Sequence, residues 1–269
     1  MIIIGNLIFL SGKRNYTMSE TKFRIWHHAG LTSCLSVRLH ELCKYRKENG
    51  FLPDAVDFRD LFIQYRDFEG EDVNEKLMAP YYPVDKLPKV NFLHTWQFKW
   101  YKKINIPKIS QLANVVCTPS ELVMNKAKEL MPLTEGRTAI LYRGNDKGKE
   151  ILPTPYEAMV EMAKETGNNK FIVQTDEEEF FHYFKEKFPD TIAFTEIPRI
   201  KRNANDFVLP TQGKRVEFAI NFLAALVALS KCNTACIITG NIGLWFAIFR
   251  GNTKGIWQYN GKRQKFKKS

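Results

Sequence analysis

The feature that most constrains the fold is an alternation of short apolar runs with longer helical patterns between residues 138 and 249. The runs have the length of strands that are buried on both faces of a sheet. Strands that alternate with helices form parallel sheets from βαβ units. The predicted strands are residues 138–142, 171–174, 191–194 and 235–239, and the predicted helices are residues 154–166, 178–188, 215–230 and 244–249.

The first half of the chain carries a weaker version of the same pattern. It predicts strands at residues 22–27, 55–58, 62–65, 90–93 and 114–117, and helices at residues 34–45 and 122–130. Two prolines interrupt the pattern between residues 107 and 119, and it then starts again. We therefore expect an α/β protein with two Rossmann-like βαβ domains, residues 1–113 and 114–269, which face a cleft.

Composition restricts the class of protein and of partner. The chain has 269 residues, is 44% hydrophobic, and carries 40 Lys and Arg against 29 Asp and Glu, for a net charge of +11. This hydrophobic content is typical of a globular protein and excludes a wholly disordered one. The positive charge predicts an anionic partner, which leaves nucleic acid, a membrane surface and a phosphorylated small molecule open. We interpret the basic segment 261–269 as a solvated end.

The cysteines and the first residues bear on the compartment. The five cysteines have no spacing typical of a small disulfide scaffold, so we expect reduced thiols in the core. The apolar run at residues 1–10 is shorter than the roughly 20 residues of a membrane span, and its basic residues follow it, unlike those of a signal peptide. We expect a soluble cytoplasmic protein, and whether residues 1–17 belong to its functional part stays open.

Three loops after predicted strands carry polar residues, and ligands of α/β sheets bind at such loops. The first, Arg143 to Glu150, contains two glycines and three cations, but it matches neither a P-loop nor a GxGxxG fingerprint. It is suited to a diphosphate, and a solvated turn is the alternative. The second loop begins Thr175-Asp176, which is also ordinary helix capping. The third, Thr239-Gly240-Asn241, precedes a predicted helix and is suited to an anion.

The residues of these loops and the elements between them occur in a specific order along the chain. Residues 139–147 (AILYRGNDK), with Glu150 and Tyr156 after them, are followed by a strand that ends in Thr175-Asp176 and by a helix, strand and small-residue loop at 229–241. This order resembles the three motifs of the α-1,6-fucosyltransferase superfamily, over residues 138–251. The resemblance implies a GT-B glycosyltransferase that inverts configuration, needs no metal or other cofactor, and binds a nucleotide sugar in its C-terminal domain.

The resemblance also implies roles for single residues. Arg143 would contact the donor diphosphate and stabilise the charge that develops on it, and Lys147 would add positive charge. Glu150 falls near the base proposed for the family, and Asp72 in an acidic loop of the N-terminal domain is its rival. Apart from the resemblance, His28 at the end of the first predicted strand is a candidate to contact the diphosphate or the acceptor from across the cleft. The other donor-binding candidates are Gly144, Thr175, Asp176, Thr239, Gly240 and Asn241.

The sequence departs from the family pattern at positions that recognise the donor. Several donors and functions therefore stay open. Leu141 stands where the family has His, and Gly144 stands where it has a second Arg. The predicted donor is therefore GDP-fucose or a UDP-sugar such as UDP-xylose, and the acceptor is a hydroxyl of a glycan or glycoprotein. Basic segments such as residues 102–108 suggest peripheral membrane contact. The alternatives are a catalytically inactive sugar-binding relative and a nucleic-acid-binding module, although the cations are spread along the chain.

Overall fold

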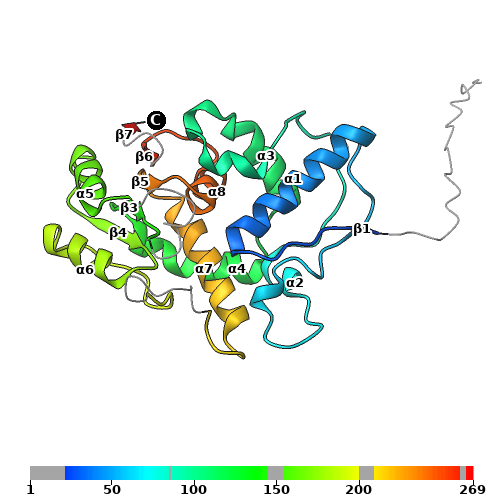
Figure 1. Cartoon of the computed structure of the whole chain (residues 1–269), viewed down its shortest axis with the longest axis horizontal. Coiled ribbons are helices and arrows are strands. Elements are labelled where there is room, and N and C mark those ends of the chain that lie inside the picture. The colour runs from blue at the N-terminus through cyan, green and yellow to red at the C-terminus, as the bar shows by residue number, and fades with distance from the viewer. Residues whose placement is uncertain (1–21, 85, 145–153, 200–208, 261–264, 269) are drawn as a thin grey trace, which may run out of the picture.

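The computed structural model describes residues 22–84, 86–144, 154–199, 209–260 and 265–268. A five-stranded sheet with helices on both faces forms the C-terminal half, and the N-terminal half packs against one of these helical layers (Figure 1). The predicted α/β class is confirmed.

The sheet is built around strand β3 (Thr138–Leu141). The strand order is β4-β3-β5-β6-β7, with β4 at Phe171–Gln174, β5 at Thr234–Ile238, β6 at Ile256–Asn260 and β7 at Lys265–Lys268. The first four strands are parallel, and β7 runs antiparallel to β6. The chain therefore leaves β3 toward β4 on one side and returns to β5 on the other, which makes the gap between β3 and β5 the topological switch point.

Alternate residues of the strands face different helical layers, as the pleat of a strand requires. Ile140 packs with helices α5 (Tyr156–Glu165) and α6 (Glu178–Lys187) on one face. Ala139 and Leu141 pack on the other face with α7 (Arg215–Leu229) and α8 (Asn241–Arg250). Because both faces are covered, every residue of β3 and β4 is buried.

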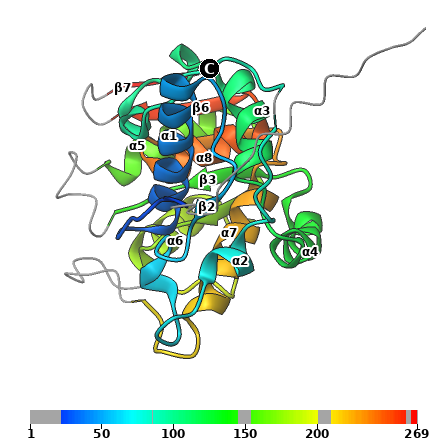
Figure 2. The same cartoon turned by 90° about the vertical axis from the view of Figure 1, so that its right-hand side faces the viewer.

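The N-terminal half has two short parallel strands, β1 (Phe23–Arg24) and β2 (Val56–Asp57), in the part of the chain that the structure describes. Its helices are α1 (Leu31–Asn49), α2 (Val73–Leu77), α3 (Ile106–Val116) and α4 (Glu121–Leu130), with 3-10 turns at Ile63–Tyr65, His94–Phe98, Tyr101–Lys103 and Met131–Thr134. Helices α1 and α3 lie beside α8, while α2 and α4 contact α7 (Figure 2). One continuous core thus joins the N-terminal half to the α7–α8 layer.

Three predicted strands of the N-terminal half, at residues 62–65, 90–93 and 114–117, are wrong. Residues 63–65 form a 3-10 turn that Phe62 precedes, and Phe62 and Tyr65 are both buried three positions apart. Residues 114–117 are the end of helix α3, whose Pro107 lies in the first turn, where proline does not break a helix. The proposed boundary between residues 113 and 114 consequently falls inside α3.

Other segments also differ from the predictions. Residues 90–93 form no strand, and residues 191–194 contribute one bridge, between Ile192 and Ile172. Strand β6 was not predicted, and residues 265–268, which were predicted to belong to a solvated end, form strand β7. Short apolar or basic runs have no decisive periodicity, so their pairing depends on which strand they meet.

Candidate functional site

The loops that follow β3 and β5 meet at the switch point of the sheet. The amide of Tyr142 still donates to the carbonyl of Gln174 at 3.0 Å, so Arg143 is the first residue beyond the ladder. Arg143 lines two adjoining pockets. The smaller, which we name the diphosphate pocket after the ligand proposed for it below, is lined by Leu141, Tyr142, Arg143 and residues 238–243.

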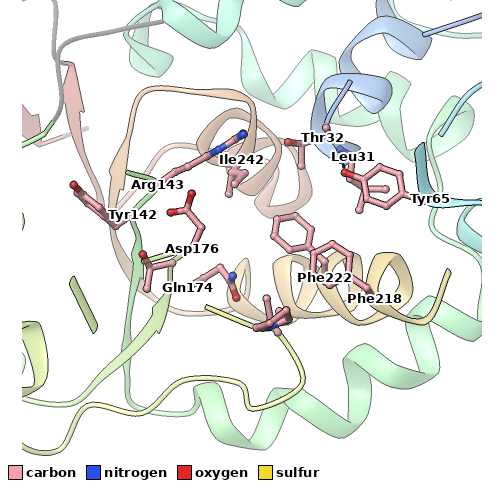
Figure 3. Close-up of a pocket in the computed structure, with 14 residues that line it drawn as sticks. Leu31, Thr32, Tyr65, Tyr142, Arg143, Gln174, Asp176, Phe218, Phe222 and Ile242 are labelled. Carbon is pink, nitrogen blue, oxygen red and sulfur yellow. Dashed lines mark hydrogen bonds between the residues drawn. The ribbon is translucent and has the colours of Figure 1, made fainter. Parts of the chain in front are cut away.

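The larger, central pocket lies between Arg143 and the N-terminal half. Arg143 and Asp176 lie on one side of it, and Leu31, Thr32 and Tyr65 lie on the other (Figure 3). Phe218 and Phe222 of α7 form an aromatic wall, with the Phe218 ring stacked on that of Tyr65 at 6.4 Å between centroids. The pocket therefore joins a charged end to an apolar end.

Sequence reasoning missed the aromatic wall. Phe218 and Phe222 are part of a helix that is apolar on nearly all sides, so their spacing does not distinguish a pocket wall from core. Tyr65 was predicted to lie in a strand; instead it is the last residue of a 3-10 turn, and its hydroxyl accepts a hydrogen bond from the amide of Leu31 at 2.8 Å. This bond holds the start of α1 at the pocket, and burial raises the pKa of Tyr65.

Gly144 and Asp176 connect the loops after β3 and β4. The amide of Gly144 donates to Oδ1 of Asp176 at 3.0 Å. A Cβ on Gly144 would lie 2.0 Å from Oε1 of Glu177, whose carboxylate accepts a 2.6 Å hydrogen bond from the Tyr156 hydroxyl. Glu177 thus occupies the space that a second arginine at position 144 would require.

Thr175 and Thr239, two predicted donor-binding residues, use their side chains within the fold. Thr175 Oγ1 accepts from the amide of Glu177 at 3.1 Å, which forms the turn before α6. Thr239 Oγ1 donates to the carbonyl of Tyr259 at 2.9 Å and accepts from Gln258 at 3.1 Å. Both threonines are buried. Each lines a pocket, Thr175 the central and Thr239 the diphosphate pocket.

Gly240 and Asn241 lie at the start of α8, and both are held by the N-terminal half. The Tyr101 hydroxyl is hydrogen-bonded to the amide and the carbonyl of Gly240, and Ser36 Oγ donates to Asn241 Oδ1 at 2.8 Å. The first amides of a helix have no partner within the helix. The amino end of α8 therefore presents positive potential to the diphosphate pocket, next to Arg143.

His28, the histidine candidate, and its neighbour His27 precede the first turn of α1. His28 is exposed, with Nε2 3.4 Å from the side-chain nitrogen of Gln64. His27 Nε2 lies 3.0 Å from Ser33 Oγ, and burial, followed by the nearby His94 and His28, lowers its pKa. Neither imidazole lines the central pocket or the diphosphate pocket, so the structure does not bring His28 to Arg143.

The carboxylate candidates have different outcomes. Asp72 caps helix α2 by accepting from the amide of Asn74 at 2.9 Å, and it lines a cavity with Asp54 and Asp57 rather than either pocket that contains Arg143. The structure does not bring Asp72 together with Arg143. Glu150 and Lys147 lie outside the described residues.

The described ranges contain neither a metal-binding cluster nor a membrane-spanning helix. No group of three or more His, Cys, Asp or Glu side chains in these ranges is arranged to hold a metal ion. None of the helices described is long and apolar enough to cross a bilayer.

Comparisons with known proteins agree at the level of the fold. No model of a protein family matches the chain, and no curated protein matches its sequence. Crystal structures of NodZ α-1,6-fucosyltransferase do match. The structure co-crystallised with GDP has a TM-score of 0.52 and 12% sequence identity, and the match covers 93% of this chain and 99% of the NodZ chain. The structure soaked with GDP-fucose has a TM-score of 0.57 and 11% identity, and the match covers 93% of this chain and 100% of the NodZ chain. The structure of fucosyltransferase NodZ from Bradyrhizobium has a TM-score of 0.51 and 12% identity over 90% and 97%. The chain therefore has a fucosyltransferase-like GT-B fold.

Proposed function

We propose that this protein is a glycosyltransferase that moves a sugar from a nucleotide diphosphate to a hydroxyl of a glycan or glycoprotein, with inversion and without a metal ion. The observation that carries the proposal is the diphosphate pocket, where Arg143 and the amino end of α8 meet at the switch point of a parallel sheet. The fold shared with NodZ, which was crystallised with GDP and soaked with GDP-fucose, supports it.

Arg143 has the central chemical role in this proposal. As the glycosidic bond breaks, negative charge grows on the diphosphate, and a guanidinium can donate two parallel hydrogen bonds to it. The amino end of α8 adds the potential of its unpaired amides. Together they supply the positive charge that a divalent cation supplies in other transferases, and one such preorganised donor contributes about 3–4 kcal/mol to the transition state.

The base and the donor are the open parts of the proposal. Glu150 remains the proposed base, whereas Asp72 is a helix cap that faces another cavity. The Glu177 carboxylate against Gly144 leaves no space for a second arginine, which favours a donor other than GDP-fucose, such as a UDP-pentose. The apolar end of the central pocket is suited to the less polar part of either donor.

Calorimetric titration with GDP and with UDP, in buffer containing EDTA, tests the donor class. We expect one of the two nucleotides to bind and an adenine nucleotide to bind more weakly. Binding of neither nucleotide would refute the proposal. Binding without turnover of GDP-fucose or UDP-xylose, in a transfer or hydrolysis assay, would identify an inactive relative.

Substitution of Arg143 tests the mechanism. Arg143→Ala should lower kcat about 100-fold or more, as loss of a single transition-state donor does. The control is Arg59→Ala, because Arg59 is 71% exposed, pairs with Asp57 and lies outside both pockets. Equal activity of the Arg143 variant and the control would remove Arg143 from the mechanism.

A further inference from the structure

A buried polar network fastens the N-terminal half to the back of the diphosphate pocket. Gln258 of β6 accepts from the amide of Tyr101 at 2.8 Å and donates to the carbonyl of Lys99 at 2.9 Å and to Thr239 Oγ1 at 3.1 Å. Gln258 and Tyr101 are each 0% exposed. The Tyr101–Lys103 turn is thereby held against the end of β5. The two segments are distant in sequence, since Tyr101 and Gly240 are 139 residues apart.

The Tyr101 hydroxyl bonds to both polar groups of Gly240. It accepts from the Gly240 amide at 3.0 Å and donates to the Gly240 carbonyl at 2.7 Å. These two bonds orient the peptide planes on both sides of Gly240, the residue that precedes α8. Glycine has more backbone freedom than any other residue, so its orientation here depends on the partner. A Cβ on Gly243 would lie 3.1 Å from the same hydroxyl, which shows how closely Tyr101 packs under the first turn of α8.

Ser36 is a second attachment from the N-terminal half. It lies on α1, is fully buried, and donates from Oγ to Asn241 Oδ1 at 2.8 Å. The same oxygen accepts from Trp245 Nε1 at 2.9 Å, so the hydroxyl is engaged as donor and acceptor. Two successive residues at the start of α8, Gly240 and Asn241, are therefore each held by a different segment of the N-terminal half.

We propose that Tyr101 and Ser36 are positioning residues for the donor: they hold the amino end of α8 in the orientation that faces Arg143. Neither residue lines either pocket, so their effect on a ligand passes through Gly240 and Asn241. The inference rests on the proposed function for its ligand, a nucleoside diphosphate. Its physical basis is preorganisation, because dipoles that are already aimed at a charge need no rearrangement when that charge binds or develops.

The first test measures the loop without any ligand. Tyr101→Phe keeps the ring and removes both hydrogen bonds to Gly240. The Leu244 amide donates to the Gly240 carbonyl. Amide hydrogen exchange at Gly240 and Leu244, measured relative to that of the β3 amides, should become about 10-fold faster or more than in the wild type. The control is Tyr81→Phe, which also removes one hydroxyl bond to a backbone carbonyl, that of Pro53 at 2.9 Å, at another cavity. Wild-type protection at Gly240 and Leu244 in Tyr101→Phe would overturn the proposal.

The second test measures the consequence for the ligand. GDP and UDP are titrated into the wild type and both tyrosine variants, and the unfolding midpoint in urea is measured for each. We expect Tyr101→Phe to bind the nucleotide about 10-fold more weakly, with a larger rise in the donor KM than fall in kcat, and Tyr81→Phe to match the wild type. Wild-type nucleotide affinity despite faster loop exchange would overturn the positioning role.

The two tests separate this proposal from the proposed function. If the wild type binds neither nucleotide, the proposed function fails, while the exchange result still decides whether Tyr101 orients the start of α8. If Tyr101→Phe does not fold, Ser36→Ala takes its place, because it removes the second attachment from a different element. Wild-type exchange at Leu244 together with wild-type nucleotide affinity in Ser36→Ala would then overturn the proposal.

Discussion

The backbone amide of Gly144 donates a hydrogen bond to the carboxylate of Asp176 at 3.0 Å. This bond joins the loop after β3 to the loop after β4, and its two residues are 32 positions apart in the sequence. It sits next to Arg143 at the charged end of the central pocket. The backbone that carries the proposed diphosphate contact is therefore fixed by a carboxylate from the neighbouring strand.

The close approach of Glu177 to Gly144 predicts that substitutions at these two positions have non-additive effects on stability. Gly144→Ala places a methyl group against the buried carboxylate of Glu177, which Tyr156 holds, and should lower the free energy of unfolding by about 1–3 kcal/mol. In a Glu177→Ala background the same change should cost much less, since the clashing atoms are gone. Urea unfolding of the four proteins measures the interaction, and additive effects would contradict the prediction.

Replacing Gly243 by alanine should destabilise the protein, although such a change in a helix is usually stabilising. Replacing a glycine inside a helix by alanine ordinarily stabilises by about 0.5–1 kcal/mol. A Cβ on Gly243 would lie 2.7 Å from the carbonyl oxygen of Ile238, which is backbone at the end of β5 and cannot move away freely. Gly243→Ala should therefore lower the unfolding free energy by about 1–3 kcal/mol. Gly30→Ala is the control, because no atom lies within 4 Å of its Cβ, and a stabilised Gly243 variant would be the contrary result.

His27 should make stability depend on pH. Burial, followed by the nearby His94 and His28, lowers the pKa of His27 below that of an unperturbed histidine, which is about 6.5. Between the two values the unfolded chain holds more protons than the folded chain, so the free energy of unfolding falls as the pH drops below about 6.5. His27→Gln should flatten this slope between pH 7.5 and 5.5 in urea unfolding.

A second histidine serves as the control for that experiment. His182 is 64% exposed and pairs with Glu178 on α6, far in sequence from the His27 group. His182→Gln keeps the buried His27, so the part of the slope that His27 causes should remain in this variant. If His27→Gln keeps the wild-type slope as well, burial of His27 does not set the pH dependence.

The cysteines should be inert in the folded protein. All five are free and buried, and burial raises the pKa of Cys34 and of Cys232 to about 11 and that of Cys43 to about 12. Thiolate is the reactive form, so reaction with a thiol reagent at pH 8 should be slow in the native state and complete for five thiols in denaturant. Rapid native labelling would contradict this prediction, which extends the sequence interpretation of reduced core thiols.

The sequence predicted the C-terminal half more accurately than the N-terminal half for a physical reason. β4 was predicted with its observed bounds, and β3 and α7 to within one residue, because strands and helices covered on both sides need continuous apolar runs. Residues 62–65 and 114–117 are also apolar runs, but they are short. Such runs fit a helical turn as well as a strand, and packing against α7 and α8 decided between them.

The candidate site was predicted in part. Arg143, Gly144, Asp176 and Gly240 were identified because carboxyl ends of parallel strands converge wherever the strands pair. Asp72 was named for its charge, and only the structure shows that it caps α2 in another cavity.

The amino-acid sequence by itself determined the alternation of strands and helices, the excess of positive charge and the place of Arg143 directly after a strand, because these depend on the order of residues alone. The tertiary structure decided the rest. It brought Phe218, Tyr65 and Arg143 to one pocket, and it placed Tyr101 and Ser36 behind the start of α8. Contacts between residues so distant in the chain follow from how whole layers pack, and no local pattern in the sequence encodes them.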